Sequence, residues 1–121
     1  MGALVYPIRT PEELANPSVV KVVFDRKGFA LYFSRSPMPY VISTSSKPRY
    51  YKHIGPYAYR MEFLVKFTQM ERGMLEQWES LEQLRALEHG YRIKVVETKF
   101  DSQEVDTSED LEKVRKIMKR E

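Results

Sequence analysis

The clearest pattern in the first half of the chain is a pair of short runs rich in β-branched and aromatic residues. Both lie in residues 19–34, VVKVVFDRKGFALYFS, and a turn from Asp25 to Gly28 separates them. Such residues favour strands, and Gly28 can supply the positive φ that a tight turn needs. The pattern predicts a β-hairpin that ends near Arg35, because the prolines that follow cannot continue a strand.

Three segments follow the hairpin. Residues 43–51, STSSKPRYY, have the Ser, Thr and Pro content of an exposed loop. Residues 53–60, HIGPYAYR, are typical of a strand, in which Pro56 indicates either an edge position or a bulge. Residues 61–69, MEFLVKFTQ, predict a short helix whose apolar side carries Phe63, Leu64 and Phe67.

The longest helical pattern covers residues 75–89, LEQWESLEQLRALEH. At about 100° per residue, one broad apolar side carries Trp78, Leu81, Leu84 and Leu87. The polar side carries Glu79, Glu82 and Gln83. His89-Gly90 supplies a C-terminal stop, so the pattern predicts one amphipathic helix over this range.

The C-terminal part of the chain predicts a strand and a last helix. The strand is expected in residues 91–100, YRIKVVETKF. Thr107 and Asp110 can form a capping box over a helix whose apolar stripe is Leu111, Val114, Ile117 and Met118. The resulting order, β-β-β-α-α-β-α, predicts an α/β layer structure with a mixed sheet.

Composition narrows the class of protein. The 121 residues suit a single domain, 1–121, and 42% apolar with 31% charged residues is ordinary for a globular chain. A net charge of +3 is too small to indicate nucleic acid, but it fits an anionic small ligand. The absence of cysteine excludes a disulfide scaffold and a cysteine nucleophile. The N-terminus has no long apolar run, so we expect a cytoplasmic protein without a membrane span.

Motifs of self-contained chemistry are absent from the sequence. It has no Gly-rich phosphate loop, no GxSxG elbow and no histidine pair at metal-ligand spacing. From the residues alone, each remaining candidate has a structural alternative. His53 can be an ordinary core or surface histidine, and Arg35 a surface charge. Glu79, Glu82 and Gln83 can form a solvated helix face, while Asp106 can stabilise the helix that follows it.

Four longer motifs occur in a fixed order and favour a functional role for these residues over the structural alternatives. They are VVKVVFDRKGFALYFSRSPMPY, YYKHIGPYAYR, LEQWESLEQLRALEHGYRIKVVE and VDTSEDLEKVR. Together they resemble the C-terminal half of the CMP-Kdo synthetase family, the 3-deoxy-manno-octulosonate cytidylyltransferases. The resemblance starts near residue 18, and residues 1–17 are similar to a variable leading segment.

The resemblance implies a fold and a reaction. The fold would be part of the nucleotide-diphospho-sugar transferase fold, which is Rossmann-like with a mixed sheet and a β-hairpin. The whole enzyme would join CMP from CTP to the sugar acid Kdo, with release of pyrophosphate, for lipopolysaccharide synthesis. The family's nucleotide loop and second metal-binding aspartate belong to an N-terminal half that this chain does not contain. The chain would then be a truncated member that carries the sugar-acid side of the site.

The resemblance also implies roles for individual residues. Arg35 matches an arginine beside the sugar acid, and a guanidinium fork suits a carboxylate. The other positions that match the lining of the sugar pocket are His53, Tyr57, Glu82, Gln83 and, as a weaker candidate, Glu79. Asp106 matches an aspartate that helps to hold Mg²⁺, the expected cofactor.

Three departures from the family pattern leave other hypotheses open. They are Pro56 in place of an aliphatic residue, Arg72-Gly73 in place of Pro-Ser, and Glu104 in place of glycine. One alternative is a non-catalytic dimerisation or interaction module, or a remnant of the family. Another is a related transferase for a different sugar acid. In each case we expect a homo-oligomer, a dimer or larger, or a complementing N-terminal half as partner, and neither nucleic acid nor a membrane.

Overall fold

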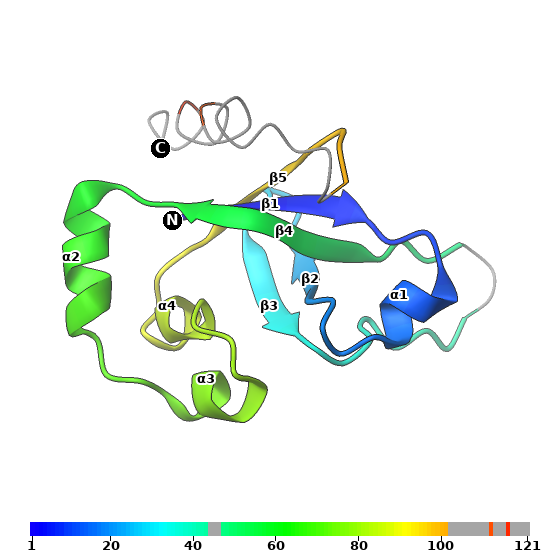
Figure 1. The fold of residues 1–121 in the computed structure, drawn as a ribbon, viewed down its shortest axis with the longest axis horizontal. Helices are drawn as coiled ribbons and strands as arrows, with labels where there is room; N and C mark the ends of the chain where they lie inside the picture. Colours follow the sequence, from blue (N-terminus) through cyan, green and yellow to red (C-terminus); the bar gives the residue numbers. More distant parts are fainter. Residues whose placement is uncertain (44–46, 102–111, 113–115, 117–121) are drawn as a thin grey trace.

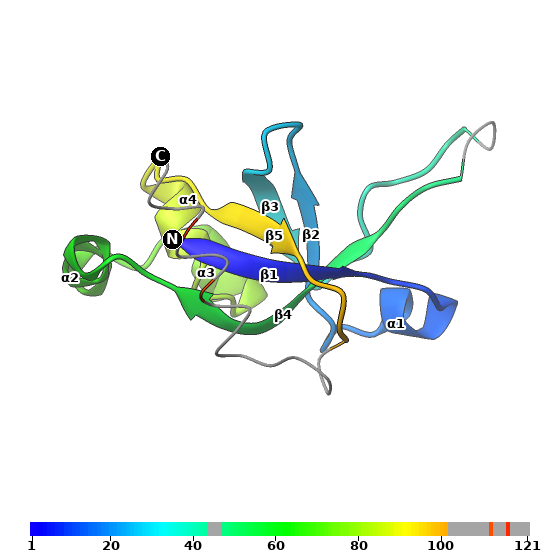
Figure 2. The ribbon, with the colours of Figure 1, turned by 90° about the horizontal axis from the view of Figure 1, so that it is seen from above.

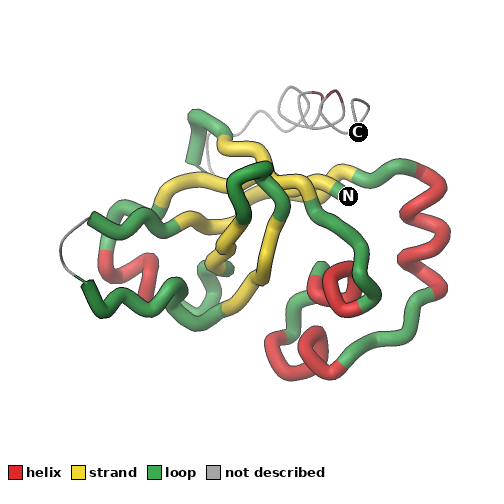
Figure 3. Tube along the Cα trace, turned by 180° about the vertical axis from the view of Figure 1, so that it is seen from behind, coloured by secondary structure: helices red, strands yellow, loops and turns green. Residues whose placement is uncertain are grey.

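The computed structural model of the chain describes residues 1–43, 47–101, 112 and 116. Its strands are β1 (Gly2–Pro7), β2 (Lys21–Phe24), β3 (Ala30–Ser34), β4 (Tyr51–Ala58) and β5 (Lys94–Glu97). Its helices are α1 (Pro11–Ala15), α2 (Met61–Gln69), α3 (Met74–Glu79) and α4 (Leu84–Glu88). The strands form one sheet in the order β3-β2-β4-β1-β5, shown in Figure 1. Figure 3 shows α2, α3 and α4 gathered at one end of this sheet and α1 at the other.

The sheet is mixed, as the sequence predicted. β1 is antiparallel to β4 and parallel to β5. β2 is antiparallel to both β3 and β4. The predicted hairpin is confirmed as β2 and β3. Its turn is held by the Asp25 carboxylate, which accepts hydrogen bonds from the amides of Lys27 and Phe29. Gly28 adopts a φ of +83°, the conformation that favours glycine.

The sequence pattern missed β1 and α1, so the expected element order is wrong at its start. β1 lies between β4 and β5 and is buried over Ala3, Leu4 and Val5. A strand buried on both faces reads as a continuous apolar run rather than an alternation, and ALVY is such a run. α1 begins beside Thr10, whose hydroxyl accepts a hydrogen bond from the amide of Glu13.

The two faces of β1 meet different partners. Ala3 and Val5 belong to the main core, which also contains Val22, Phe33, Phe67, Leu81, Leu84, Ala86 and Ile93. This core lies between the sheet and the helices α2 and α4, whose positions relative to the sheet can be followed in Figure 2. Leu4 points to the other face, where it packs with Ile54 and Ala58. The alternation is the period of two that a strand imposes.

The prediction of one helix over residues 75–89 is wrong. α3 ends at Glu79, Ser80 takes a left-handed conformation (φ 55°, ψ 47°), and α4 begins at Leu84. The cause is tertiary, because the Arg35 guanidinium binds the carbonyls of Glu79 and Ser80. Those carbonyls would otherwise accept helical hydrogen bonds. Trp78, expected on the apolar side, is 72% exposed as a result.

The predicted strand over residues 53–60 is confirmed as β4, with a bulge at Pro56. Gly2 pairs with Ala58 and Leu4 with Ile54, so three residues of β4 lie opposite Ala3 alone. The edge position offered as the alternative is wrong, since β4 lies between β2 and β1. β2, however, pairs with β4 only at Tyr51 and Lys52, so a proline beyond them interrupts no ladder to β2.

The remaining sequence predictions have mixed outcomes. The helix over residues 61–69 is confirmed as α2, and Phe67 is its buried residue. The strand expected over 91–100 is shorter and covers Lys94–Glu97. Of the predicted last helix, only Glu112 and Lys116 are described, and both are helical; its capping box and apolar stripe, with Glu104 and Asp106, lie outside the described residues. In the part of the chain that is described, no helix is both long and apolar enough to cross a bilayer.

Candidate functional site

The bulge in β4 brings two predicted site residues together. In a regular strand, residues four apart lie about 13 Å from each other. The rings of His53 and Tyr57 instead stack with centroids 4.3 Å apart and planes inclined by 9°. The Tyr57 hydroxyl lies 3.5 Å from Nδ1 of His53, and Gly55 permits the bend with a φ of +68°. The irregular backbone around Pro56 therefore builds this pair.

Burial sets the charge state of both side chains. It lowers the pKa of His53 to about 4, so the imidazole is neutral at pH 7. It also raises the pKa of the Tyr57 hydroxyl, with smaller contributions from Tyr59 and Glu82, so this group stays protonated. Nε2 of His53 is buried and has no hydrogen-bond partner among the described residues. A buried polar atom without a partner is costly, so this nitrogen is an unusual feature of the candidate site.

Glu82 and Gln83 lie at the start of α4 and differ in exposure. Glu82 is exposed, and its charge raises the pKa of the hydroxyls of Tyr57 and Tyr59 in addition to their burial. Gln83 is only 4% exposed, so it does not belong to a solvated helix face. The structure therefore places Glu82 within electrostatic reach of the His53–Tyr57 pair.

Arg35 and Glu79 form a second group, which ties the end of β3 to the end of α3. Oε2 of Glu79 accepts hydrogen bonds from the Ser34 hydroxyl at 2.6 Å and the Tyr32 hydroxyl at 3.2 Å. Oε1 accepts a hydrogen bond of 3.1 Å from the backbone amide of Arg35. The Arg35 guanidinium in turn donates to the carbonyls of Pro17, Glu79 and Ser80. Glu79 is thus engaged by the protein, and the sequence did not single out Tyr32 and Ser34.

Phe33 connects the two groups. Its ring lies 6.1 Å from the His53 ring, while its chain neighbours Tyr32 and Ser34 bind Glu79. The six predicted residues of the described part therefore lie along β3, β4 and the α3–α4 junction. No direct contact joins Arg35 to His53 within the described residues.

A buried ion pair that the sequence did not reveal fixes α4 to α3. Arg85 donates two hydrogen bonds of 2.8 Å to the carboxylate of Glu76, which is 4% exposed. In an uninterrupted helix, residues nine apart lie on opposite sides and about 13 Å apart along the axis. The pair exists only because the helix breaks at Ser80, so the helix pattern gave no signal for it.

The described residues do not make up a metal site. They contain no group of three or more His, Cys, Asp or Glu side chains that could hold an ion. Asp106, the residue expected to bind Mg²⁺, lies outside them. We therefore assign no step of a reaction to a metal here.

Comparison with known proteins shows the family. Residues 1–99 match the sequence profile of a protein family described as Cytidylyltransferase. The chain belongs to the cytidylyltransferase family. It is 58% identical over 118 residues to the 3-deoxy-manno-octulosonate cytidylyltransferase of Syntrophus aciditrophicus, and 50% identical over 119 residues to that of Solibacter usitatus. Each alignment covers 98% of this chain, so the similarity extends into the first 17 residues.

A solved structure agrees with this family and with the fold. It is a structure of CMP:2-keto-3-deoxy-manno-octonic acid synthetase complexed with CTP, with a TM-score of 0.76 and 45% sequence identity. The match covers 98% of this chain and 48% of that one. The chain spans about half the length of the curated relatives it matches. The fold is therefore a partial nucleotidyltransferase fold, and the coverage is consistent with the predicted C-terminal half.

Proposed function

We propose that this chain forms the C-terminal half of a CMP-Kdo synthetase and supplies the sugar-acid side of its site. The reaction is the transfer of CMP from CTP to Kdo with release of pyrophosphate, as a step toward lipopolysaccharide. The observation that carries the proposal is 58% identity to a 3-deoxy-manno-octulosonate cytidylyltransferase over nearly the whole chain. The CTP in the solved relative supports the choice of nucleotide.

The side chains of the proposed wall suit a sugar acid. Neutral His53 offers a buried ring nitrogen without a partner in the described residues, which a sugar hydroxyl can bind. The Arg35 guanidinium has five N–H donors, of which three bind carbonyls. The donors that remain can bind a carboxylate in a fixed orientation. Tyr57, Glu82 and Gln83 add polar groups along the same wall, whereas Glu79 holds Arg35 in place.

In the proposed reaction, a hydroxyl oxygen of the sugar acid forms a bond to the α-phosphorus of CTP. The bond from that phosphorus to the bridging oxygen breaks, and pyrophosphate leaves with the electron pair. The hydroxyl proton is lost to solvent. The residues described here contribute by orienting the acceptor, which is the major part of catalysis where groups are transferred between bound substrates.

Magnesium is a further part of the proposal. Phosphoryl-transfer sites hold Mg²⁺ with one or two carboxylates and the substrate's phosphates. Asp106 would provide one carboxylate, and residues outside this chain the remainder. Manganese-induced broadening of NMR signals, compared between the wild type and Asp106→Asn, tests this assignment without measuring activity.

Pyrophosphate release from CTP and Kdo tests the function. The assay compares the chain alone with the chain fused behind the part of the Syntrophus aciditrophicus relative that it lacks. We expect release from the fusion and a loss of at least tenfold on His53→Ala. A fusion that folds and binds CTP but releases no pyrophosphate would favour the interaction module. Faster release with a sialic acid than with Kdo would favour the related transferase.

We also propose that the protein is cytoplasmic and assembles as a dimer. Large apolar side chains exposed on the chain support association, among them Leu31 at 61% on the edge strand β3 and Trp78 at 72% on α3. Light scattering of the purified chain should give twice its mass of 14.3 kDa. A mass of one chain at all concentrations would contradict the dimer.

A further inference from the structure

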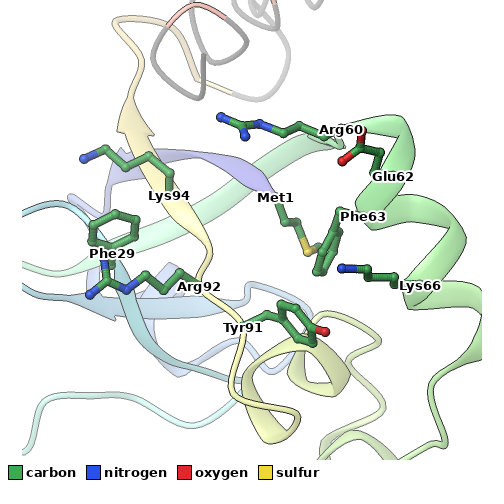
Figure 4. Close-up of a pocket in the computed structure, with 9 residues that line it drawn as sticks. All are labelled: Met1, Phe29, Arg60, Glu62, Phe63, Lys66, Tyr91, Arg92 and Lys94. Carbon is green, nitrogen blue, oxygen red and sulfur yellow. The ribbon is translucent and has the colours of Figure 1, made fainter. Parts of the chain in front are cut away.

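A cleft separate from the sugar-acid wall opens where α2 approaches the start of β5. Its volume is about 290 Å³. The residues that line it are Met1, Phe29, Arg60, Glu62, Phe63, Lys66, Tyr91, Arg92 and Lys94. Figure 4 shows Glu62, Phe63 and Lys66 on α2, Tyr91 across from them, and Arg92 and Lys94 extending toward Phe29 from β5 and the segment before it. None of these residues belongs to the proposed sugar-acid wall.

The charge of the cleft is its distinctive feature. Four cationic side chains, Arg60, Lys66, Arg92 and Lys94, line the cleft together with one carboxylate, Glu62. Some cations elsewhere in the chain have carboxylate partners, as Lys52 has in Glu13 and Asp101 and Arg85 has in Glu76. Within the described residues, Arg60, Lys66 and Arg92 have no carboxylate at ion-pair distance. Cations of like charge in one cleft repel each other, and a bound anion removes this repulsion.

Two of the cations are held in position by an aromatic ring. The guanidinium of Arg92 lies 4.5 Å and the ammonium of Lys94 lies 4.6 Å from the centre of the Phe29 ring. Lys94 also donates a hydrogen bond of 2.5 Å to the carbonyl of Lys27. Asp25 is the acid whose field reaches Arg92, but its carboxylate is bound to the amides of the hairpin turn. Arg92 and Lys94 are therefore positioned before a ligand arrives, which lowers the entropy cost of binding.

The rest of the lining limits the size and type of the ligand. Phe63 and Tyr91 pack edge to face at 5.2 Å and close the apolar side of the cleft. A volume of about 290 Å³ admits a small molecule rather than a polymer. Several cations around a small space favour a compact anion that carries more than one charge. A diphosphate group has this chemistry, whether it is free pyrophosphate or part of a nucleotide.

We propose that this cleft binds a diphosphate group through Arg60, Lys66, Arg92 and Lys94. The site lies apart from the residues of the proposed wall, and binding does not require transfer of CMP. It is therefore measured on the 121-residue chain in the absence of Kdo and Mg²⁺. Failure of this proposal would leave the proposed function untouched, and the reverse also holds.

Calorimetric titration with pyrophosphate tests the site. The variant Arg60→Gln/Arg92→Gln removes two charges from the cleft, and Lys47→Gln/Arg49→Gln removes two from exposed positions outside it. We expect binding to weaken about tenfold or more in the first variant and less than twofold in the second. Equal weakening in both, or no binding by the wild type, would overturn the proposal.

Two further measurements test which group is recognised and where it binds. CTP and pyrophosphate should both bind and cytidine should not, because the phosphates are recognised; binding of cytidine as tight as CTP would refute that. ¹⁵N NMR of the wild-type chain locates the site even if the cleft variant fails to fold. Pyrophosphate should shift the amides of Phe29, Lys66 and Arg92, and shifts confined to other regions would contradict the assignment.

Discussion

At the scale of single residues, the proposed wall depends on a few side chains in unusual surroundings. Gly55 and Pro56 bend β4 so that Tyr57 returns to stack on His53, and burial of this pair keeps the imidazole neutral. Glu79 takes a different part, because its carboxylate is bound by Tyr32, Ser34 and the amide of Arg35. In the proposed site, His53 and Tyr57 would contact the substrate, and Glu79 would hold the backbone around Arg35 in place.

His53 makes the stability of the chain depend on pH. Its pKa is about 4 in the folded chain and 6.5 as a free side chain, so the unfolded state binds the proton first as the pH falls. The contribution is fully present above pH 6.5 and is lost between pH 6.5 and 4, by about 3 kcal/mol. Urea unfolding at several pH values measures it. The variant His53→Gln should lack this part of the slope, and an unchanged slope would contradict the assignment.

Glu79 should matter for stability more than other glutamates. Glu79→Ala leaves the Ser34 hydroxyl and the Arg35 amide without their acceptor, and we expect the free energy of unfolding to fall by about 2–4 kcal/mol. Glu71→Ala changes an exposed glutamate and should cost about 0.5 kcal/mol or less. Urea unfolding of both variants measures the difference. Equal effects would show that the Glu79 contacts contribute nothing.

At the scale of elements, the decisive feature is the break between α3 and α4. The apolar spacing of residues 75–89 predicts one helix, and it correctly identifies Leu81 and Leu84 as core residues. It cannot reveal the break, because Arg35 lies some 45 residues earlier in the chain and binds the carbonyls there. The break allows Glu76 to reach Arg85 and sets Glu82 and Gln83 at the start of a separate helix.

Ser80 provides a test of the break. Its left-handed conformation costs an ordinary residue about 1–2 kcal/mol, and a β-branched residue more. We expect Ser80→Gly to leave the chain as stable or slightly more so, and Ser80→Val to lower its thermal midpoint by several degrees. If both variants unfold at the same temperature, residue 80 is not held in this conformation in solution.

The sequence predicts those elements whose causes lie within a few neighbouring residues. The hairpin β2–β3 and helix α2 have local causes in turn residues and periodicity, and both were predicted. β1 has no alternating signal, because the strand is buried on both faces and its sequence is a continuous apolar run. The roles proposed for Arg35, His53 and Glu82 rest on the family motifs, whereas the stacking of His53 on Tyr57 depends on the bulge, which the sequence does not reveal.

At the scale of the whole molecule, β1 is the strand on which the sheet depends. It pairs with both β4 and β5, and its side chains enter the cores on both faces. The proposed sugar-acid wall is attached to this sheet through β4 and the end of β3. The first seven residues, which no motif singled out, therefore support the proposed site.

Paired leucine substitutions test the importance of β1. Leu4 is 1% exposed, and Leu4→Ala should lower the free energy of unfolding by about 2–5 kcal/mol. Leu31 is 61% exposed on β3, and Leu31→Ala should cost less than about 1 kcal/mol. Denaturant titration compares them. A small effect at Leu4 would mean that β1 is not a fixed part of the sheet.

The most direct test of the account is ¹⁵N NMR of the His53 ring during titration with Kdo. The variant His89→Gln leaves His53 as the one histidine and makes its signals unambiguous. The account predicts that Kdo shifts the Nε2 signal of His53 in a saturable manner, and that a neutral sugar of similar size does not. If the His53 signal does not shift on addition of Kdo, either in the chain alone or in the fusion with its missing half, the proposed sugar-acid wall is contradicted.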